Sequence, residues 1–152
     1  GFKTIGNLFR YSSSNIVILK EIILSEIDVY YKKFQNEKCS FIEKWPAEKD
    51  ITGWHIMLKE QGYHNLHIHQ DGWLSGVIYL KVVPSLDENE GAIIFDMAVP
   101  NISESHLPKI IHNPQKGDMV LFPSSLYHGT IPFSTDTDRI VVSFDLKPNH
   151  NK

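Results

Sequence analysis

The sequence contains a single cysteine, Cys39, among its 152 residues. One cysteine cannot form an internal disulfide, which fits a reducing compartment. No apolar run approaches the roughly 20 residues that a membrane-spanning helix needs, and no segment has the pattern of a signal peptide. The sequence therefore predicts a cytoplasmic protein with no membrane partner.

Positive charge is also scarce, since 15 lysines and arginines stand against 18 acidic residues, for a formal net charge of -3. We therefore expect no nucleic acid partner. A chain of this length can bury a core of its own. We predict one domain, residues 1–152, with a helical lead-in at about 13–36 and a β-rich core at about 53–147. The chain begins at Gly1, and two arrangements stay open: a homodimer, or a part of a larger chain.

The N-terminal part has the pattern of one long helix, in the segment SSSNIVILKEIILSEIDVYYKKF. Serines at its start can cap free N–H groups, and lysines at its end suit the C-terminal dipole. Apolar residues recur every three or four positions, which predicts one buried face packed on a sheet. These apolar positions are Ile16, Leu19, Ile22, Ile23, Ile27 and Tyr30.

From Trp54 onward the sequence changes to short runs rich in β-branched and aromatic residues, separated by turn residues. This spacing is typical of an all-β sandwich or jelly roll. The stretch from Pro100 to Pro114 has no such pattern, and we expect an irregular loop there, either a lid or a plain surface excursion. The predicted strands are 54–60, 66–69, 75–83, 91–99, 117–124, 128–133 and 139–146.

Two histidines, His67 and His69, are separated by one residue within the segment LHIH. Residues two apart in a strand point to the same face, so both imidazoles should aim together. Two imidazoles on one face can occupy adjacent positions on a metal ion. A pair of exposed strand histidines without chemistry is the alternative.

Two later residues bear on this choice. His128 follows an apolar strand, and antiparallel pairing in a jelly roll can bring it within reach of the early pair. Arg139 shares one face of its strand with Val141, Ser143 and Asp145. A buried arginine on that face requires an anion, and its planar fork suits a carboxylate. Alternatively, Arg139 faces outward and pairs with a neighbouring aspartate.

The order of these residues, HxH, a distal histidine and then an arginine on a β-rich chain, resembles the iron(II)- and 2-oxoglutarate-dependent oxygenases. The segments GWHIMLKEQGYHNLHIHQDGWLSGVIYL and GDMVLFPSSLYHGTIPF, followed by RIVVSFDL, are similar to a small bacterial and phage branch of that superfamily. Gln70 stands where the branch has proline. The resemblance covers residues 54–146 and implies a double-stranded β-helix, the cupin-like form of the jelly roll.

The resemblance also implies roles for individual residues. His67 and His128 match the family's metal-binding histidines, and Arg139 matches the arginine that binds the far carboxylate of 2-oxoglutarate. Tyr79 and Ser143 are expected to donate hydrogen bonds to that carboxylate.

One position departs from the commonest pattern of the superfamily, HxD, because His69 occupies the place of the aspartate. We favour His67, His69 and His128 as the ligands. Asp71 is the alternative ligand, in a register that makes His69 the first histidine. Three neutral imidazoles leave iron(II) with two net positive charges, whereas a carboxylate in the set leaves one.

By resemblance, the cofactors are Fe(II), 2-oxoglutarate as cosubstrate and O2. The expected reaction is a hydroxylation that couples decarboxylation of 2-oxoglutarate to succinate with oxidation of a small molecule or a peptide or protein side chain. Two other functions stay open. One is a cupin-like three-histidine dioxygenase or metal-binding module that does not use 2-oxoglutarate, and the other is a non-enzymatic jelly-roll domain.

Overall fold

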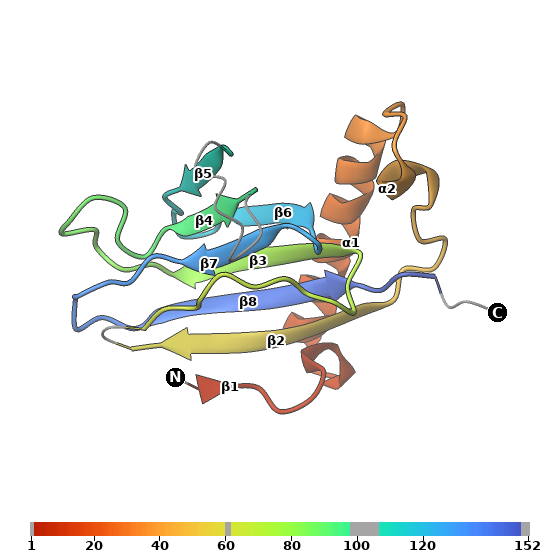
Figure 1. Cartoon of the computed structure of the whole chain (residues 1–152). Helices are drawn as coiled ribbons and strands as arrows, with labels where there is room; N and C mark the ends of the chain where they lie inside the picture. Colours follow the sequence, from red (N-terminus) through yellow and green to blue (C-terminus); the bar gives the residue numbers. More distant parts are fainter. Residues whose placement is uncertain (1, 60–61, 98–106, 150–152) are drawn as a thin grey trace.

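The computed structural model describes residues 2–59, 62–97 and 107–149. Two helices and a short 3-10 turn precede most of the strands, which follow one another to the end of the fold (Figure 1). In chain order the elements are β1 (Phe2–Lys3), η1 (Leu8–Arg10), α1 (Ser14–Phe34), α2 (Ser40–Glu43), β2 (Ile51–Leu58), β3 (Leu74–Lys81), β4 (Ile93–Asp96), β5 (Lys109–His112), β6 (Met119–Pro123), β7 (Tyr127–Thr130) and β8 (Arg139–Leu146).

The strands form two antiparallel sheets. The larger has the order β1-β2-β8-β3-β6, and the smaller has the order β5-β4-β7. Strands distant in sequence lie side by side, since β8 is inserted between β2 and β3. The chain is mainly β, with two facing sheets and one long helix, so the predicted jelly-roll class is confirmed.

Helix α1 crosses the outer face of the larger sheet (Figure 1). Ile23 and Ile27 are fully buried there and pack against apolar residues of β2, β3 and β8. The helix begins at Ser14 and ends at Phe34, close to the predicted bounds. Two details differ from prediction. Ser13 makes no side-chain cap hydrogen bond, and Ile22 is 49% exposed because it lies on the side of the helix away from the sheet.

Strand β8 divides its residues between two cores. Val142, Phe144 and Leu146 face α1, whereas Val141 belongs to the core between the two sheets. Alternation along the strand therefore places Arg139 and Ser143 on the inner side with Val141, where they line a cavity. This is the face on which the sequence placed them.

One strand prediction is wrong, and one loop prediction is wrong in part. Leu66–His69 is not a strand, because only His67 forms a bridge, to His128, and the backbone around it follows no regular ladder. Part of the Pro100–Pro114 stretch is regular, since Lys109–His112 forms β5 and pairs with β4. Residues 100–106 of that stretch lie outside the described residues, as do the last residues of the predicted strands 54–60 and 91–99.

Within the parts of the chain that the structure describes, no helix has both the length and the apolar character that crossing a membrane requires.

Candidate metal centre

The segment before β3 carries the histidine pair and runs antiparallel to β7. The backbone N–H of His67 donates to the carbonyl of His128 at 3.0 Å, and the N–H of His128 donates back at 3.1 Å. The N–H of Thr130 donates to the carbonyl of His64 at 3.0 Å. These bonds fix the early pair next to His128, although about 60 residues separate them in sequence.

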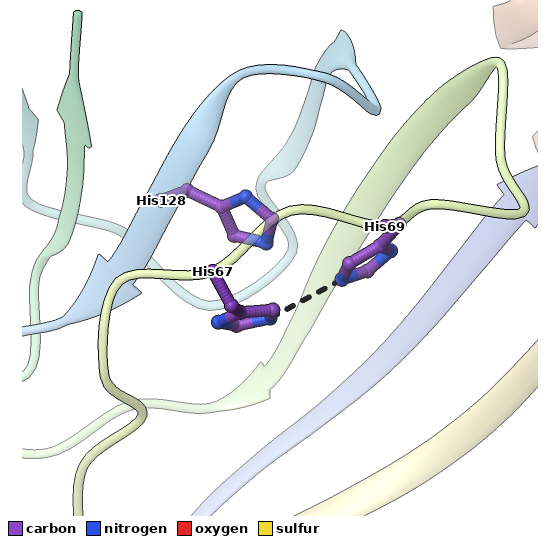
Figure 2. Close-up of side chains that lie close together, drawn as sticks. All are labelled: His67, His69 and His128. Atoms are coloured by element: carbon purple, nitrogen blue, oxygen red, sulfur yellow. Dashed lines mark hydrogen bonds between the residues drawn. The ribbon is translucent and has the colours of Figure 1, made fainter. Parts of the chain in front are cut away.

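Three imidazoles meet at this point. Figure 2 shows the rings of His67, His69 and His128 turned toward one another, with His128 projecting from β7 and the pair from the preceding segment. Each residue offers a ligand nitrogen, and the three atoms lie within 4.8 Å of one another. The antiparallel arrangement predicted from the sequence thus brings the three together, while their binding of a metal stays a prediction.

Hydrogen bonds define the tautomer of each ring. The Nδ1 atom of His67 lies 2.7 Å from the carbonyl oxygen of Asn65, and that of His128 lies 2.9 Å from the carbonyl of Leu126. The Nδ1 of His69 lies 2.6 Å from Oδ1 of Asp145. Because these oxygens accept, Nδ1 carries a hydrogen in all three rings, which leaves Nε2 as the atom that can bind a metal.

The free Nε2 atoms face each other. Those of His67 and His69 are 3.3 Å apart, the separation of a hydrogen bond when one of the two carries a hydrogen (dashed line in Figure 2). When both rings are neutral and carry their hydrogen on Nδ1, the two lone pairs face each other, and a cation between them would accept both. Three converging imidazole nitrogens, each oriented by an outer hydrogen bond, are a donor set that fits Fe²⁺ and other divalent transition metals.

The protonation state of His128 also favours metal binding. Burial, together with the two neighbouring histidines, lowers the pKa of His128 to about 4, although the carbonyl of Leu126 acts in the opposite direction. The ring is therefore neutral near pH 7, and a metal need not displace a proton from it.

The histidines line a cavity of about 540 Å³ between the sheets. Arg139 and Ser143 of β8 line it as well, and Trp54, Tyr63 and Lys3 lie at the same cavity. The Lys3 ammonium lies 4.7 Å from the centre of the Trp54 ring.

Arg139 is 4% exposed, yet no carboxylate among the described residues pairs with it. Its Nε atom is buried without a hydrogen-bond partner, as is the hydroxyl of Tyr79. Burial lowers the pKa of Arg139 and raises the pKa of Tyr79. Each residue partly offsets the effect of burial on the other, because Tyr79 raises the pKa of Arg139 and Arg139 lowers the pKa of Tyr79. The two residues therefore offer a buried cation and a protonated phenol with unused donors, a combination that fits an anionic ligand.

The structure gives no support to Asp71 as the alternative ligand. This residue is exposed, it does not line the cavity, and it is not among the residues whose ligand atoms converge. It lies in the turn after His69, where the N–H of Gly72 donates to the carbonyl of His69 at 3.2 Å. That turn directs the chain away from the cavity before β3 begins.

Two residues at the site were missed. His64, which was not among the predicted site residues, lines the cavity with its ring centre 6.0 Å from that of His67. Burial is the largest cause of its lowered pKa, followed by the neighbouring His67. Regular alternation places His64 opposite His67, and only the irregular backbone between them brings it inside. The second residue is Asp145. The sequence already placed it on the same strand face as Arg139, and this feature could have identified it as a site residue.

Known proteins match this chain over the region that holds the site. A family profile described as "Putative 2OG-Fe(II) oxygenase" matches residues 52–145. A search among curated proteins gives no match.

Solved structures share the fold at low sequence identity. An oxidoreductase of the 2OG-Fe(II) oxygenase family from Burkholderia pseudomallei has a TM-score of 0.50 and 11% identity, over 70% of this chain and 51% of that one. HygX from Streptomyces hygroscopicus, with nickel and 2-oxoglutarate bound, has a TM-score of 0.50 and 13% identity, over 70% and 59%. A prolyl-4-hydroxylase from Pseudomonas putida has a TM-score of 0.49 and 15% identity, over 65% and 52%. The chain thus spans between half and three fifths of the length of these proteins.

The profile begins at the second residue of β2, includes all three histidines and ends at Asp145 in β8, so that it covers 94 of the 152 residues (145 − 52 + 1). This chain therefore belongs to the 2OG-Fe(II) oxygenase family.

Proposed function

We propose that the protein is an iron(II)- and 2-oxoglutarate-dependent dioxygenase that hydroxylates a small molecule or a peptide or protein side chain. It would couple this oxidation to decarboxylation of 2-oxoglutarate to succinate. One observation carries the proposal: three convergent Nε2 atoms and a buried arginine without an acidic partner line the same cavity.

His67, His69 and His128 would hold the iron through their Nε2 atoms. When bound, iron(II) supplies coordination sites for the keto acid end of 2-oxoglutarate and for O2, together with the redox chemistry that a protein side chain lacks. The three Nδ1–H groups stay bound to their oxygen acceptors, so that the rings keep their orientation.

Arg139 would bind the far carboxylate of 2-oxoglutarate, because its guanidinium is buried and unpaired. The Tyr79 hydroxyl, which has no partner, and Ser143, on the Arg139 face, would donate further hydrogen bonds. The apolar side chains of Val77, Ile93 and Val141 line the same cavity and would exclude water from the reacting atoms.

The test is to measure succinate formation from 2-oxoglutarate with Fe(II) and O2, and, in the absence of O2, the visible charge-transfer band of the iron–2-oxoglutarate complex. We expect the purified protein to give both signals. His128→Ala should abolish both, and Arg139→Ala should weaken 2-oxoglutarate binding at least 100-fold. His112→Ala is the matched control, since His112 lies in β5 and pairs with Asp118 outside the cavity.

A charge-transfer band and succinate release that need neither Arg139 nor His128 would refute the proposal. Metal binding at the three histidines with no response to 2-oxoglutarate would instead favour the cupin-like three-histidine function.

A further inference from the structure

Asp145 lies directly behind one of the three histidines. Its Oδ1 atom accepts hydrogen bonds from Nδ1 of His69 at 2.6 Å and from Oγ of Ser75 at 2.7 Å. Ser75 lies 2.8 Å from Oγ of Ser124, so the carboxylate is held by a small buried network. Asp145 is 6% exposed, and its Oδ1 atom uses two acceptor positions, one for each of these neighbours.

The chain leaves room for this arrangement at Gly72. A Cβ atom added there would lie 2.5 Å from Oγ of Ser124 and 3.2 Å from Cγ of Asp145. The segment between His69 and β3 therefore packs closely on Ser124 and Asp145, and a side chain at position 72 would overlap the Ser124 hydroxyl of this network.

The site carries an excess of positive charge that this carboxylate can reduce. Three neutral imidazoles leave a divalent ion with both of its positive charges, in a cavity that already contains the buried cation Arg139. No carboxylate among the described residues joins the convergent ligand atoms. A buried carboxylate hydrogen-bonded to a ligand imidazole raises the basicity of that ligand and returns negative charge to the centre.

We propose that Asp145 is a positioning residue that supplies, through the His69 ring, the negative charge that a ligand carboxylate would otherwise contribute to the metal. The inference rests on the proposed function, because it requires a metal at the three histidines. It explains how HIH can stand in place of HxD. A carboxylate is absent from position 69, but Asp145 of β8 provides one on the far side of the His69 ring.

The test is the affinity for Co²⁺, measured by calorimetry without 2-oxoglutarate, because it does not depend on turnover. Asp145→Asn removes the charge but keeps an oxygen that accepts from His69 Nδ1–H. We expect about 10- to 100-fold weaker Co²⁺ binding. Ser124→Ala is the matched control. It removes the remote hydrogen bond of the same network and keeps the charge, so we expect at most about a threefold change.

A second background separates charge from structure. His69→Asp places a carboxylate directly among the ligands, next to Asp145. In that background, Asp145→Asn removes a like charge and should strengthen Co²⁺ binding or leave it unchanged. The weakening of Co²⁺ binding should therefore disappear or reverse in the second background, which a loss of folding cannot produce. Circular dichroism and thermal unfolding of each variant accompany the titrations.

Two outcomes would overturn the inference and leave the metal centre standing. One is that Asp145→Asn binds Co²⁺ as tightly as the unmodified protein, while His128→Ala does not bind. The other is that Asp145→Asn weakens binding equally in both backgrounds. If the unmodified protein itself does not bind Co²⁺, the inference and the proposed function fail together.

Discussion

The guanidinium carbon of Arg139 lies 5.1 Å from the centre of the Tyr79 ring, and both side chains are almost completely buried. A cation over an aromatic face is favourable, but it does not replace an anion, and neither residue has an acidic partner among the described residues. The pair thus keeps a desolvated positive charge at the cavity. Binding of a dianionic cosubstrate would neutralise it.

Arg139→Met should therefore stabilise the protein in the absence of ligand. It removes a buried unpaired charge and keeps most of the side-chain volume, so we expect the free energy of unfolding to rise by about 1–3 kcal/mol. Urea denaturation checks this, with Arg10→Met at an exposed position as the control for net charge. With metal already present, further addition of 2-oxoglutarate should stabilise the unmodified protein more than it stabilises the variant. A large loss of stability in Arg139→Met would mean that the guanidinium has a structural partner.

Tyr79→Phe separates the hydroxyl from the ring. The hydroxyl is buried without a partner, so its removal should change the free energy of unfolding by less than about 1 kcal/mol, in either direction. If it donates to the far carboxylate of 2-oxoglutarate, the variant should bind 2-oxoglutarate about 3- to 10-fold more weakly with unchanged metal affinity. Calorimetric titration of the Mn²⁺-loaded protein measures both values. Equal 2-oxoglutarate affinity in the two proteins would leave Tyr79 a role in packing only.

The SG pair at the start of β3 has a separate explanation for each residue. Ser75 holds Asp145, and Gly76 makes room for the ring of Phe144 on the neighbouring strand, since a Cβ at position 76 would overlap that ring. Phe144 is fully buried under α1. Gly76→Ala should therefore destabilise the protein by about 1–3 kcal/mol.

A second substitution identifies the cause. Phe144→Leu shortens the obstructing side chain, so the double variant Gly76→Ala with Phe144→Leu should be more stable than the sum of the two single effects allows. Thermal unfolding of the four proteins completes the cycle. Strict additivity would show that the glycine is needed for another reason.

The sequence predicted those parts of the fold that follow from periodicity. Helix α1 and the two-sided pattern of β8 could be recognised because each buries one face along a regular repeat. The expectation of antiparallel pairing in a jelly roll also placed His128 near His67, and an antiparallel bridge joins the two residues.

What the sequence could not predict depends on irregular backbone. His69 donates its N–H to the carbonyl of Ser124 rather than to a strand partner, so LHIH resembles a strand without forming one. Strand β5 has Ile110 and Ile111 both exposed, which leaves no alternation to detect. The contact between His69 and Asp145 joins residues 76 positions apart, and it depends on the turn at Gly72, which no local pattern specifies.

Acid should destabilise the metal-free protein through His128. Its pKa is about 4 in the folded state and about 6.5 in the unfolded chain. The unfolded state therefore binds more protons between these values, and stability falls as the pH drops from about 6.5 to about 4. The full loss, reached below pH 4, is on the order of 3 kcal/mol. His128→Asn removes the titration and keeps a side-chain N–H near the carbonyl of Leu126, so its stability should depend less steeply on pH in this window. Denaturant unfolding of both proteins is measured at each pH with chelator present. The difference between the two proteins isolates the contribution of His128 from that of the acidic residues. If the free energy of unfolding has the same pH dependence in both, the His128 ring is not buried as the structure has it.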